Sequence, residues 1–529
     1  MKSYFKIVKM MFASNRRLLF GAFIVMTALI AVEMAIPLGI NAMIDMLETD
    51  KAVYTFAIAV LLFIIGYFLL SLLSGLNTRL YIRIGNDLLW NMRRKIYKVL
   101  WGSEYMEHVQ KSKDKFKYVL SGQTYTAFAI AVIYSVGGFV NTLTVTAFLI
   151  IAFWYSIPAG ITLVLGIAFT LGTSFITGRG ILGNYELCDK AHEQDTAQVY
   201  ETVDMVEATR TNGLEDYYLT KNKKIHDSFM KLSEKAEGKS AFFETLEKSF
   251  NDLIYIIVAG MLLLTSNVSG GKLVTVLFIT NTILAVSGRV QRQIQVIIKN
   301  IPAFDNVVKL MDIPIISGKE ISDIENISFE NVTLEIDDRK IMNNISFDIN
   351  KGDNVLIRGE NGSGKSSILK MILGLYKPSN GQVSINDTPV SEYDSCSFYK
   401  EICYVSQDEL ILNECVEDYL RYVTHSDCSE DEIEAMRKKL NLNPEIDVIE
   451  ENGATLSGGE KKKLFMMKCM MESDVSLVIL DEIDAGLDVE TKALLKDLEK
   501  ELLSDPDKMV IKISHIDSDD TGFDQIIEL

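Results

Sequence analysis

The stretch NVLIRGENGSGKSSILKMI, residues 354–372, combines an apolar β-type run, a glycine-rich turn and a helical pattern. Within it, residues 359–366 match G-x-x-x-x-G-K-[ST], and they do so in the strand–loop–helix setting that this pattern requires. Glycines let backbone N–H groups approach phosphates closely, and the N-terminus of the following helix favours an anion. The stretch therefore predicts a P-loop α/β domain that binds a nucleotide.

The loop contains side chains with separate expected roles. We expect Lys365 to reach the β- and γ-phosphates and the Ser366 hydroxyl to bind Mg²⁺. The alternative is a chance glycine turn, which the strand before it and the helix after it make the weaker interpretation. The other positions expected to line the phosphate cradle are Gly359, Asn361, Gly362, Ser363, Gly364 and Ser367.

A second motif, SLVILDEIDAGLD at residues 476–488, is typical of a buried parallel strand that ends in two carboxylates. We expect Asp481 to hold Mg²⁺, directly or through water, and Glu482 to polarise an attacking water. Alone, an apolar run followed by Asp-Glu is equally typical of a helix cap. Its position after a P-loop favours the catalytic interpretation.

The chain divides into two parts of different composition. Residues 1–324 carry 32 Lys and Arg against 27 Asp and Glu, whereas residues 325–529 carry 21 against 44. The acidic part lacks the basic surface that binding to a phosphate backbone needs, so we expect no nucleic-acid partner. Five of the six cysteines lie in the acidic part without a C-x-x-C pair, which indicates a reduced, cytosolic domain.

Long apolar runs are concentrated in the first part of the chain. Six of them are long enough, or nearly so, to cross a bilayer as helices of about 20 residues. We therefore expect an all-α, six-helix transmembrane domain fused to the P-loop α/β nucleotide-binding domain. The expected spans are residues 18–40, 54–76, 127–153, 159–177, 253–267 and 273–291.

The basic residues predict the orientation of these spans. Five of them precede the first span: Lys2, Lys6, Lys9, Arg16 and Arg17. This bias places the N-terminus and the nucleotide-binding domain in the cytoplasm of a multi-pass protein, which we expect to lie in a bacterial plasma membrane.

Two connections between spans are charged and rich in helix formers, at residues 77–126 and 178–252. With a rise of about 1.5 Å per residue, each predicts a pair of helical arms that project tens of ångströms beyond the lipid. The turns of these arms are expected at residues 101–103 and 211–213, where glycine occurs. Arms of this length predict contacts with the nucleotide-binding domain.

An ionisable residue, Glu33, lies inside the first expected span. Such residues are costly in lipid, so one interpretation is a cavity-lining carboxylate that favours cationic cargo. The other is a carboxylate near the outer end of the helix that reaches water or is protonated. The sequence leaves both open.

With these motifs in this order, the chain resembles the ATP-binding cassette (ABC) transporter family, specifically half-size exporters with six helices fused to one nucleotide-binding domain. LSGGE at residues 456–460 matches the family's signature motif. The resemblance implies that Ser457, Gly458 and Gly459 bind the γ-phosphate of ATP held by the P-loop of a second subunit. It therefore implies a homodimer with two composite sites for ATP and Mg²⁺.

The resemblance also assigns expected roles to single residues outside these three motifs. Gln407 resembles the loop glutamine that senses Mg²⁺, and His515 resembles the switch histidine that contacts the γ-phosphate. Asp488 matches the aspartate loop at the dimer interface, and Glu451 resembles the acidic loop before the signature. Ile336 stands where the family usually stacks an aromatic ring on adenine, so part of that contact is expected to be lost.

The leading hypothesis for the whole chain is an ATP-driven exporter surrounded by membrane lipid. Its expected cargo is a small amphipathic or peptide-like compound, with a cationic peptide as the specific expectation and a lipid or a hydrophobic drug as the alternative. A hypothesis from another class is an ATP-dependent membrane sensor without cargo. The expected domains are residues 1–312 for the membrane domain, 313–324 for a linker and 325–529 for the ATP-binding cassette.

Overall fold

The computed structural model describes the chain in two compact units. The first unit comprises Met1–Trp101 and Ser112–Ile313, and the second comprises Gly102–Lys111 and Pro314–Leu529. The residues described are 1–47, 52–264, 270–336, 339–406, 411–424, 428–443, 446, 448–449, 453, 456–472, 474–483, 487–514 and 520–529.

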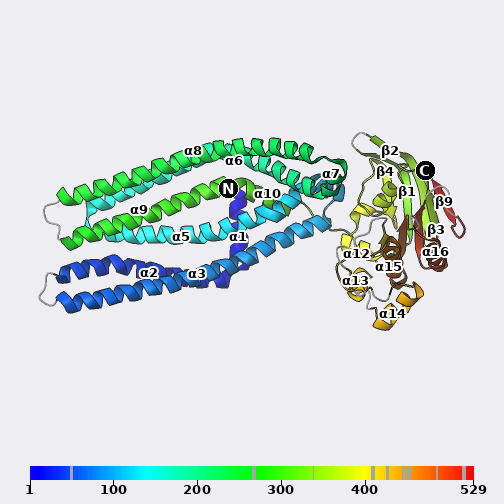
Figure 1. Ribbon diagram of the computed structural model, residues 1–529, viewed down its shortest axis with the longest axis horizontal. Helices are drawn as coiled ribbons and strands as arrows, with labels where there is room; N and C mark the ends of the chain where they lie inside the picture. The colour runs from blue at the N-terminus through cyan, green and yellow to red at the C-terminus, as the bar shows by residue number, and fades with distance from the viewer. Residues whose placement is uncertain are drawn as a thin grey trace. The chain divides into compact units, whose positions relative to one another are not determined.

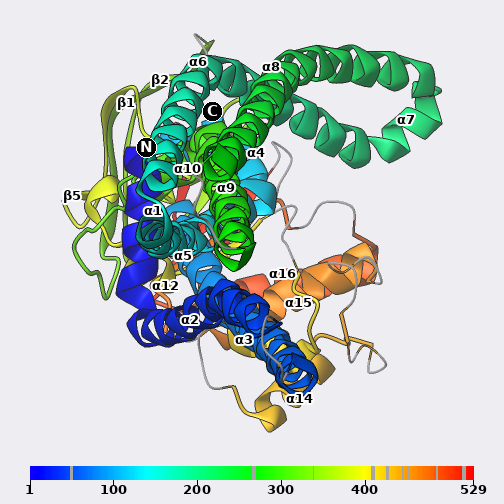
Figure 2. The same ribbon diagram turned by 90° about the vertical axis from the view of Figure 1, so that its left-hand side faces the viewer.

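The first unit is helical, and its long helices run side by side (Figure 1). The short helix α1 runs across them, and the hairpin of α6 and α8 is joined through α7 (Figure 2). The elements are α1 (Lys2–Ser14), α2 (Arg16–Leu47), α3 (Ala52–Gly102), η2 (Gln110–Ser112), α4 (Lys113–Tyr118), η3 (Val119–Gln123), α5 (Thr124–Tyr155), α6 (Ile157–Asp204), α7 (Val206–Asn212), α8 (Glu215–Leu264), α9 (Gly270–Lys299) and α10 (Ile301–Met311).

The six expected spans fall on the six long helices α2, α3, α5, α6, α8 and α9. Among the described residues, five helices are long and apolar enough to cross a membrane: Arg16–Ile36, Val60–Gly102, Gln110–Tyr155, Ile157–Asp204 and Leu273–Lys299. The remaining expected span, 253–267, begins on α8, and its last three residues lie outside the described residues. The chain therefore has the apolar helices of a multi-pass membrane protein.

Both predicted arm turns are confirmed. Helix α3 ends at Gly102, and α7 ends at Asn212 with Gly213 in the left-handed conformation at φ 63°. Glycine is favoured there because a Cβ is strained in this conformation. The first turn is less regular than we expected, because π-helical segments (η1, Tyr105–Val109, and η3) interrupt the path from α3 to α5.

The second unit contains two sheets with helices packed on them (Figure 1). An antiparallel sheet has the order β2-β1-β4-β5, and a parallel sheet has the order β6-β7-β8-β3-β9. The strands are β1 (Asn326–Ile336), β2 (Arg339–Asn350), β3 (Asn354–Arg358), β4 (Asn380–Ile385), β5 (Thr388–Pro389), β6 (Ile402–Val405), β7 (Leu477–Asp481), β8 (Met509–Ser514) and β9 (Gln525–Glu528).

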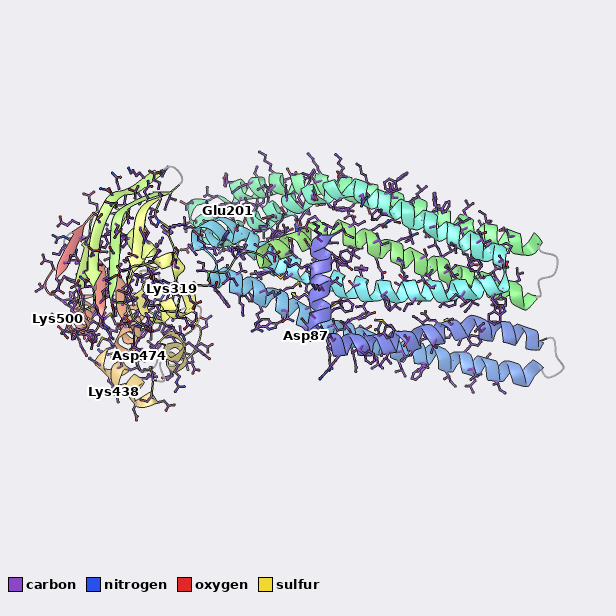
Figure 3. The ribbon with its side chains drawn as sticks, turned by 180° about the vertical axis from the view of Figure 1, so that it is seen from behind. Asp87, Glu201, Lys319, Lys438, Asp474 and Lys500 are labelled. Atoms are coloured by element: carbon purple, nitrogen blue, oxygen red, sulfur yellow. The ribbon has the colours of Figure 1, made fainter. Side chains whose placement is uncertain are left out.

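The helices of the second unit cover the parallel sheet and carry charge on their outer faces. Lys438 on α14 and Lys500 on α16 project outward from the unit, with side chains 75% and 65% exposed (Figure 3). The elements are η1, α11 (Lys365–Ile372), η4 (Val390–Glu392), α12 (Ser395–Lys400), α13 (Val416–Val423), α14 (Glu430–Lys439), α15 (Gly458–Met471) and α16 (Val489–Leu503).

The strands of the parallel sheet are apolar because both faces are covered. All five residues of β7 and all six of β8 are buried, which is the pattern expected of a central parallel strand. A buried ion pair, Lys512 Nζ to Glu499 Oε1 at 2.8 Å, joins β8 to α16. The sheet is thus a rigid base whose carboxyl edge positions the loops that follow β3 and β7.

Candidate functional site

The P-loop follows β3 and leads into α11, as the sequence predicts. Gly362 and Gly364 have φ angles of 85° and 105°, a left-handed conformation that side chains with a Cβ rarely adopt. A Cβ on Gly359 would lie 2.7 Å from the Leu529 carbonyl oxygen, so this position also needs glycine. Glycine is therefore required at Gly362 and Gly364 by the backbone conformation of the loop, and at Gly359 by the close approach of Leu529.

Lys365 is the first residue of α11 and is 5% exposed. Its Nζ donates hydrogen bonds to the carbonyl oxygens of Gly359, at 2.7 Å, and Glu360, at 3.0 Å. The ammonium group is thus held inside the curve of the loop, where phosphate oxygens would replace the carbonyls as acceptors. Ser366 and Asn361 are exposed, which leaves both side chains available to a ligand.

The strand order brings the two acidic residues to the edge where the P-loop begins. Asp481 on β7 and Ile357 on β3 both pair with Ile513 on β8, so they lie level with each other across one intervening strand. Adjacent strands are about 4.8 Å apart, which puts the end of β7 about 10 Å from the end of β3. This spacing leaves room for phosphate and a metal ion between them.

Glu482 directly follows β7 and has a φ of 51°. The Glu482 N–H donates to the Ile513 carbonyl oxygen at 3.2 Å, and the Glu482 carbonyl oxygen accepts from Lys462 Nζ at 3.5 Å. A left-handed glutamate is unusual, and strained residues of this kind cluster at functional sites. The backbone on both sides of Glu482 is thus held in place.

Tyr404 is a neighbour of the acidic pair that sequence reasoning missed. Its hydroxyl, on β6, donates to Asp481 Oδ2 at 3.4 Å. Burial, and then the charge of Glu482, raise the pKa of Asp481 above the usual range of an aspartate. A cation bound at this carboxylate would offset the cost of its burial, which is chemically consistent with a Mg²⁺ ligand.

The signature turn LSGGE forms the N-terminus of α15. Ser457 caps this helix, and it forms a capping box with Glu460, in which Ser457 N–H donates to Glu460 Oε2 at 2.8 Å and Glu460 N–H donates to Ser457 Oγ at 3.3 Å. Apart from the backbone of α15 and the two neighbouring residues, no described residue has an atom within 4 Å of a Cβ built on Gly458. The N-terminus of α15 is therefore capped locally and open at Gly458, a favourable position for an anion.

The lysines after the signature hold this helix in place. Lys462 Nζ contacts the carbonyl oxygen of Glu482, and Lys463 Nζ donates to the Asn441 carbonyl oxygen at 2.9 Å. The signature helix is thereby linked to the residue that follows β7. Composition alone did not predict this role.

Asp488 lies beside the signature of its own chain. It caps α16 by accepting from Thr491 N–H at 2.8 Å and from Thr491 Oγ1 at 2.9 Å. A Cβ on Gly459 would meet Thr491 Oγ1 at 3.6 Å and Asp488 Oδ2 at 3.9 Å. The structure therefore brings the aspartate loop and the signature glycine together.

The position expected to contact adenine is half-buried. Ile336 ends β1 and packs on the apolar core of the second unit. Ile341 and Met342 on β2 lie closer to the P-loop, because a Cβ on Gly364 would be 3.1 Å from Met342 Cε and 3.6 Å from Ile341 Cγ2. The sequence did not predict this contact, because β2 and the P-loop come together only when the chain folds.

Three predicted residues lie outside the described residues: Gln407, Glu451 and His515. The strands that precede two of them are described. Tyr404 and Val405 lie on β6 before Gln407, and β8 ends at Ser514.

Comparison with known proteins supports this arrangement. Residues 342–485 match the family model described as ABC transporter. A probable ABC transporter ATP-binding/permease protein from Haemophilus influenzae is 28% identical over 219 residues, which are 40% of this chain and 39% of that protein. The mitochondrial iron-sulfur clusters transporter ATM1 of Candida glabrata is 32% identical over 198 residues, 36% of this chain and 27% of that protein. These matches thus span well under half of either curated relative.

The solved structure of a bacterial Atm1-family ABC exporter with ATP bound has a TM-score of 0.83 to this chain at 18% sequence identity. The likeness covers 94% of this chain and 91% of the other, so it extends over both units of the fold. Residues 342–485 thus carry the ATP-binding domain of the ABC transporter family, and the chain as a whole has the fold of a half-size ABC exporter with fused membrane and nucleotide-binding domains.

Proposed function

We propose that this protein hydrolyses ATP to export a small amphipathic or peptide-like substrate by alternating access as a homodimer. One observation carries the proposal most strongly: a P-loop and a capped signature turn are both present on a chain with the exporter fold. A protein that only binds nucleotide does not need an acidic pair after β7, whereas hydrolysis does.

In this proposal, each chain gives a P-loop to one ATP and a signature turn to the other. Lys365 and the loop N–H groups bind the β- and γ-phosphates, and Ser366, Asp481 and Gln407 hold Mg²⁺. The Mg²⁺ ion neutralises phosphate charge, Glu482 orients the attacking water, and His515 contacts the γ-phosphate. Ser457, Gly458 and Gly459 of the second chain close the site, with Asp488 at the interface.

Coupling to the membrane helices is supported by the first arm turn. Gly102–Lys111 groups with the second unit rather than with the helices that flank it. The carbonyl oxygen of Gly102 accepts from Ile316 N–H at 2.7 Å, and a Cβ on Gly102 would lie 2.7 Å from Ile315 Cγ2. A segment between two membrane helices that contacts the start of the second unit at Ile315 and Ile316 is suited to transmit closure, with Gly213 as the second candidate contact.

A cargo site is supported by a cavity of about 790 Å³ between α8 and α9 of the first unit. Its lining carries both signs of charge, with three cationic and two acidic side chains: Lys248, Arg289, Arg292, Glu244 and Asp252. Glu33 is not among the residues that line this cavity, so the cavity leaves both interpretations of its carboxylate open. A mixed lining suits a peptide-like compound that carries both charges.

The sensor without cargo remains the second candidate, favoured by Ile336 in place of an aromatic ring. The test is ATP hydrolysis by the purified chain in lipid nanodiscs, with and without a panel of cationic and zwitterionic peptides, with Glu482→Gln as the blank. We expect activity above the blank that at least one peptide class raises several-fold. Activity equal to the blank under every condition would overturn the exporter and favour the sensor.

A further inference from the structure

Helix α1 presents three different faces along its 13 residues. Tyr4, Ile7 and Met11 are buried against the first unit. Phe5 and Phe12 are 62% and 52% exposed although both are large and apolar. The helical spacing thus separates a face that packs on the protein from an apolar face that does not.

The third face of α1 is basic and lies next to the phenylalanine face. Lys2, Lys6 and Lys9 follow one another at helical spacing, and all three are exposed. Lys6 pairs with Asp312. A helix that runs across a bundle, with apolar and basic faces side by side, is typical of an element in a membrane interface (Figures 1 and 3).

The phenylalanine face borders a groove of about 670 Å³ between α1, α2, α5 and α9 of the first unit. Its lining is almost wholly apolar and includes exposed aromatic rings from three of these helices: Phe12, Phe23 at 43% and Phe139 at 53% exposure. A groove that leaves this much aromatic surface uncovered needs an apolar occupant.

Some polar groups in the groove have hydrogen-bond partners within the first unit, and one buried acceptor has none among the described residues. Tyr4 and Ser135 hydrogen-bond to each other at 2.6 Å, and Thr142 donates to the Gly138 carbonyl oxygen at 2.8 Å. Gln293 Oε1 is buried, and no described residue donates to it. Among the described residues, Gln293 Oε1 is therefore a buried acceptor without a donor beside the groove, which a hydroxyl of an amphiphilic ligand would satisfy.

Positive charge gathers at the corner where α1 ends and α2 begins. Lys9, Arg16 and Arg17 are exposed, and none of the three has an ion-pair partner among the residues that the structure describes. Leu19 and Phe23, a turn or two further along α2, line the groove. Unpaired cations beside an apolar groove complement a molecule with an anionic head and a long apolar tail.

From this combination we propose that the groove is a binding site for an anionic glycerophospholipid of the leaflet that contacts α1. One acyl chain lies along Phe12, Phe23 and Phe139, and the phosphate lies against Lys9, Arg16 and Arg17. The proposal rests on the membrane location of the exporter but not on its cargo or its ATPase activity. It adds a specific lipid as a partner of this chain.

The test is native mass spectrometry of the chain released from nanodiscs that contain equal amounts of phosphatidylglycerol and phosphatidylcholine. We expect the wild-type chain to retain at least one phosphatidylglycerol under conditions that remove phosphatidylcholine. In the triple variant Lys9→Gln, Arg16→Gln, Arg17→Gln, phosphatidylglycerol retention should fall more than tenfold, since each charge contributes about fivefold to lipid affinity. The matched control Lys223→Gln, Lys224→Gln, Lys231→Gln removes three exposed charges from α8 and should keep it.

A second pair of variants fills the groove without changing charge. Thr142 and Thr146 are both exposed on α5, and each hydrogen-bonds to the carbonyl four residues earlier, but only Thr142 lines the groove. Thr142→Trp should lower phosphatidylglycerol retention several-fold, whereas Thr146→Trp should leave it unchanged.

Three outcomes would overturn the proposal. They are equal retention of both lipids, retention by the triple and Thr142→Trp variants that equals that of their controls, and retention of neither lipid by a dimeric wild-type chain. The last result would identify a second copy of the chain as the occupant of the groove. ATP hydrolysis measured on the same samples against Glu482→Gln separates failure of the exporter proposal from failure of the lipid site.

Discussion

At the scale of single residues, the candidate site depends on a few backbone conformations that only certain residues tolerate. Glu482 keeps a left-handed φ although it is not glycine, and Gly362 and Gly364 keep theirs without strain. The glycines and the carboxylate were predicted, because motif spacing encodes them. The strain at Glu482 was not, since it follows from contacts with Ile513 and Lys462 that are distant in sequence.

Asp488 gives a residue-scale prediction about stability. Its carboxylate caps α16, so Asp488→Ala should lower the unfolding temperature of the second unit by about 2–4 °C at neutral pH. Asp488→Asn retains an acceptor oxygen and should lose less. The measurement is thermal unfolding of the full chain in detergent without nucleotide, followed at the transition that added ATP shifts upward.

The same residue predicts a pH dependence. The Thr491 backbone N–H lowers the pKa of Asp488 below the usual range of an aspartate. A carboxyl with a lowered folded-state pKa stabilises the fold above its unfolded-state pKa, about 3.9, and loses this effect as the pH falls through the folded-state pKa. The difference between wild type and Asp488→Ala should therefore be largest near neutral pH and vanish in acid. A difference that grows as the pH falls would contradict the capping role.

At the scale of elements, the arm turn between α7 and α8 depends on Gly213. Apart from the two neighbouring residues, no described residue has an atom within 4 Å of a Cβ at this position, so the φ of 63° and not a steric clash disfavours a side chain there. Gly213→Ala should cost about 1 kcal/mol of unfolding free energy. Gly238→Ala is the matched control, since Gly238 has equally open surroundings inside α8 and gains helix propensity. Thermal unfolding that ranks the two variants in the opposite order would rule out this explanation of the turn.

A polar network joins the elements at one end of the first unit. Asp189 on α6 accepts from Tyr118 Oη at 3.1 Å, Gln123 Nε2 at 2.7 Å and Asn306 Nδ2 at 2.9 Å, which lie on α4, η3 and α10. Asp189→Ala leaves the Gln123 and Asn306 amides without this acceptor, whereas Tyr118 Oη keeps His192 Nδ1 as a partner at 3.0 Å, and the change should lower the unfolding free energy by about 1–3 kcal/mol. Glu186→Ala, exposed one turn earlier on α6, should change it by less than about 0.5 kcal/mol. Equal effects of the two variants would show that the network does not stabilise the unit.

Prediction from sequence succeeded for elements with a strong local pattern. The six apolar runs fall on long helices, and the strand–loop–helix around Lys365 is as expected. It missed α1 as a separate crossing helix and the π-helical segment at Val119–Gln123. Those features depend on packing against α5 and α10, which a local pattern does not record.

At the scale of the whole molecule, the proposed function requires that the P-loop of one chain and the signature of a second chain form each ATP site. The P-loop and the signature turn belong to separate elements of the second unit, α11 and α15. Each motif is locally complete, with Lys365 held by loop carbonyls and Ser457 held by Glu460. The pairing of the two motifs between chains is therefore tested by combining a P-loop variant and a signature variant in one dimer.

The most direct measurement is ATP hydrolysis by mixed dimers of Lys365→Ala and Ser457→Arg chains, each with its own affinity tag and purified in nanodiscs. If each ATP site is shared between chains, one site of a mixed dimer combines the Lys365→Ala P-loop with the Ser457→Arg signature. The other site then has a wild-type P-loop and a wild-type signature. We predict that each variant alone hydrolyses ATP at the level of the Glu482→Gln blank, and that the mixed dimer recovers up to about half of the wild-type rate. A mixed dimer no more active than the blank would contradict the shared site.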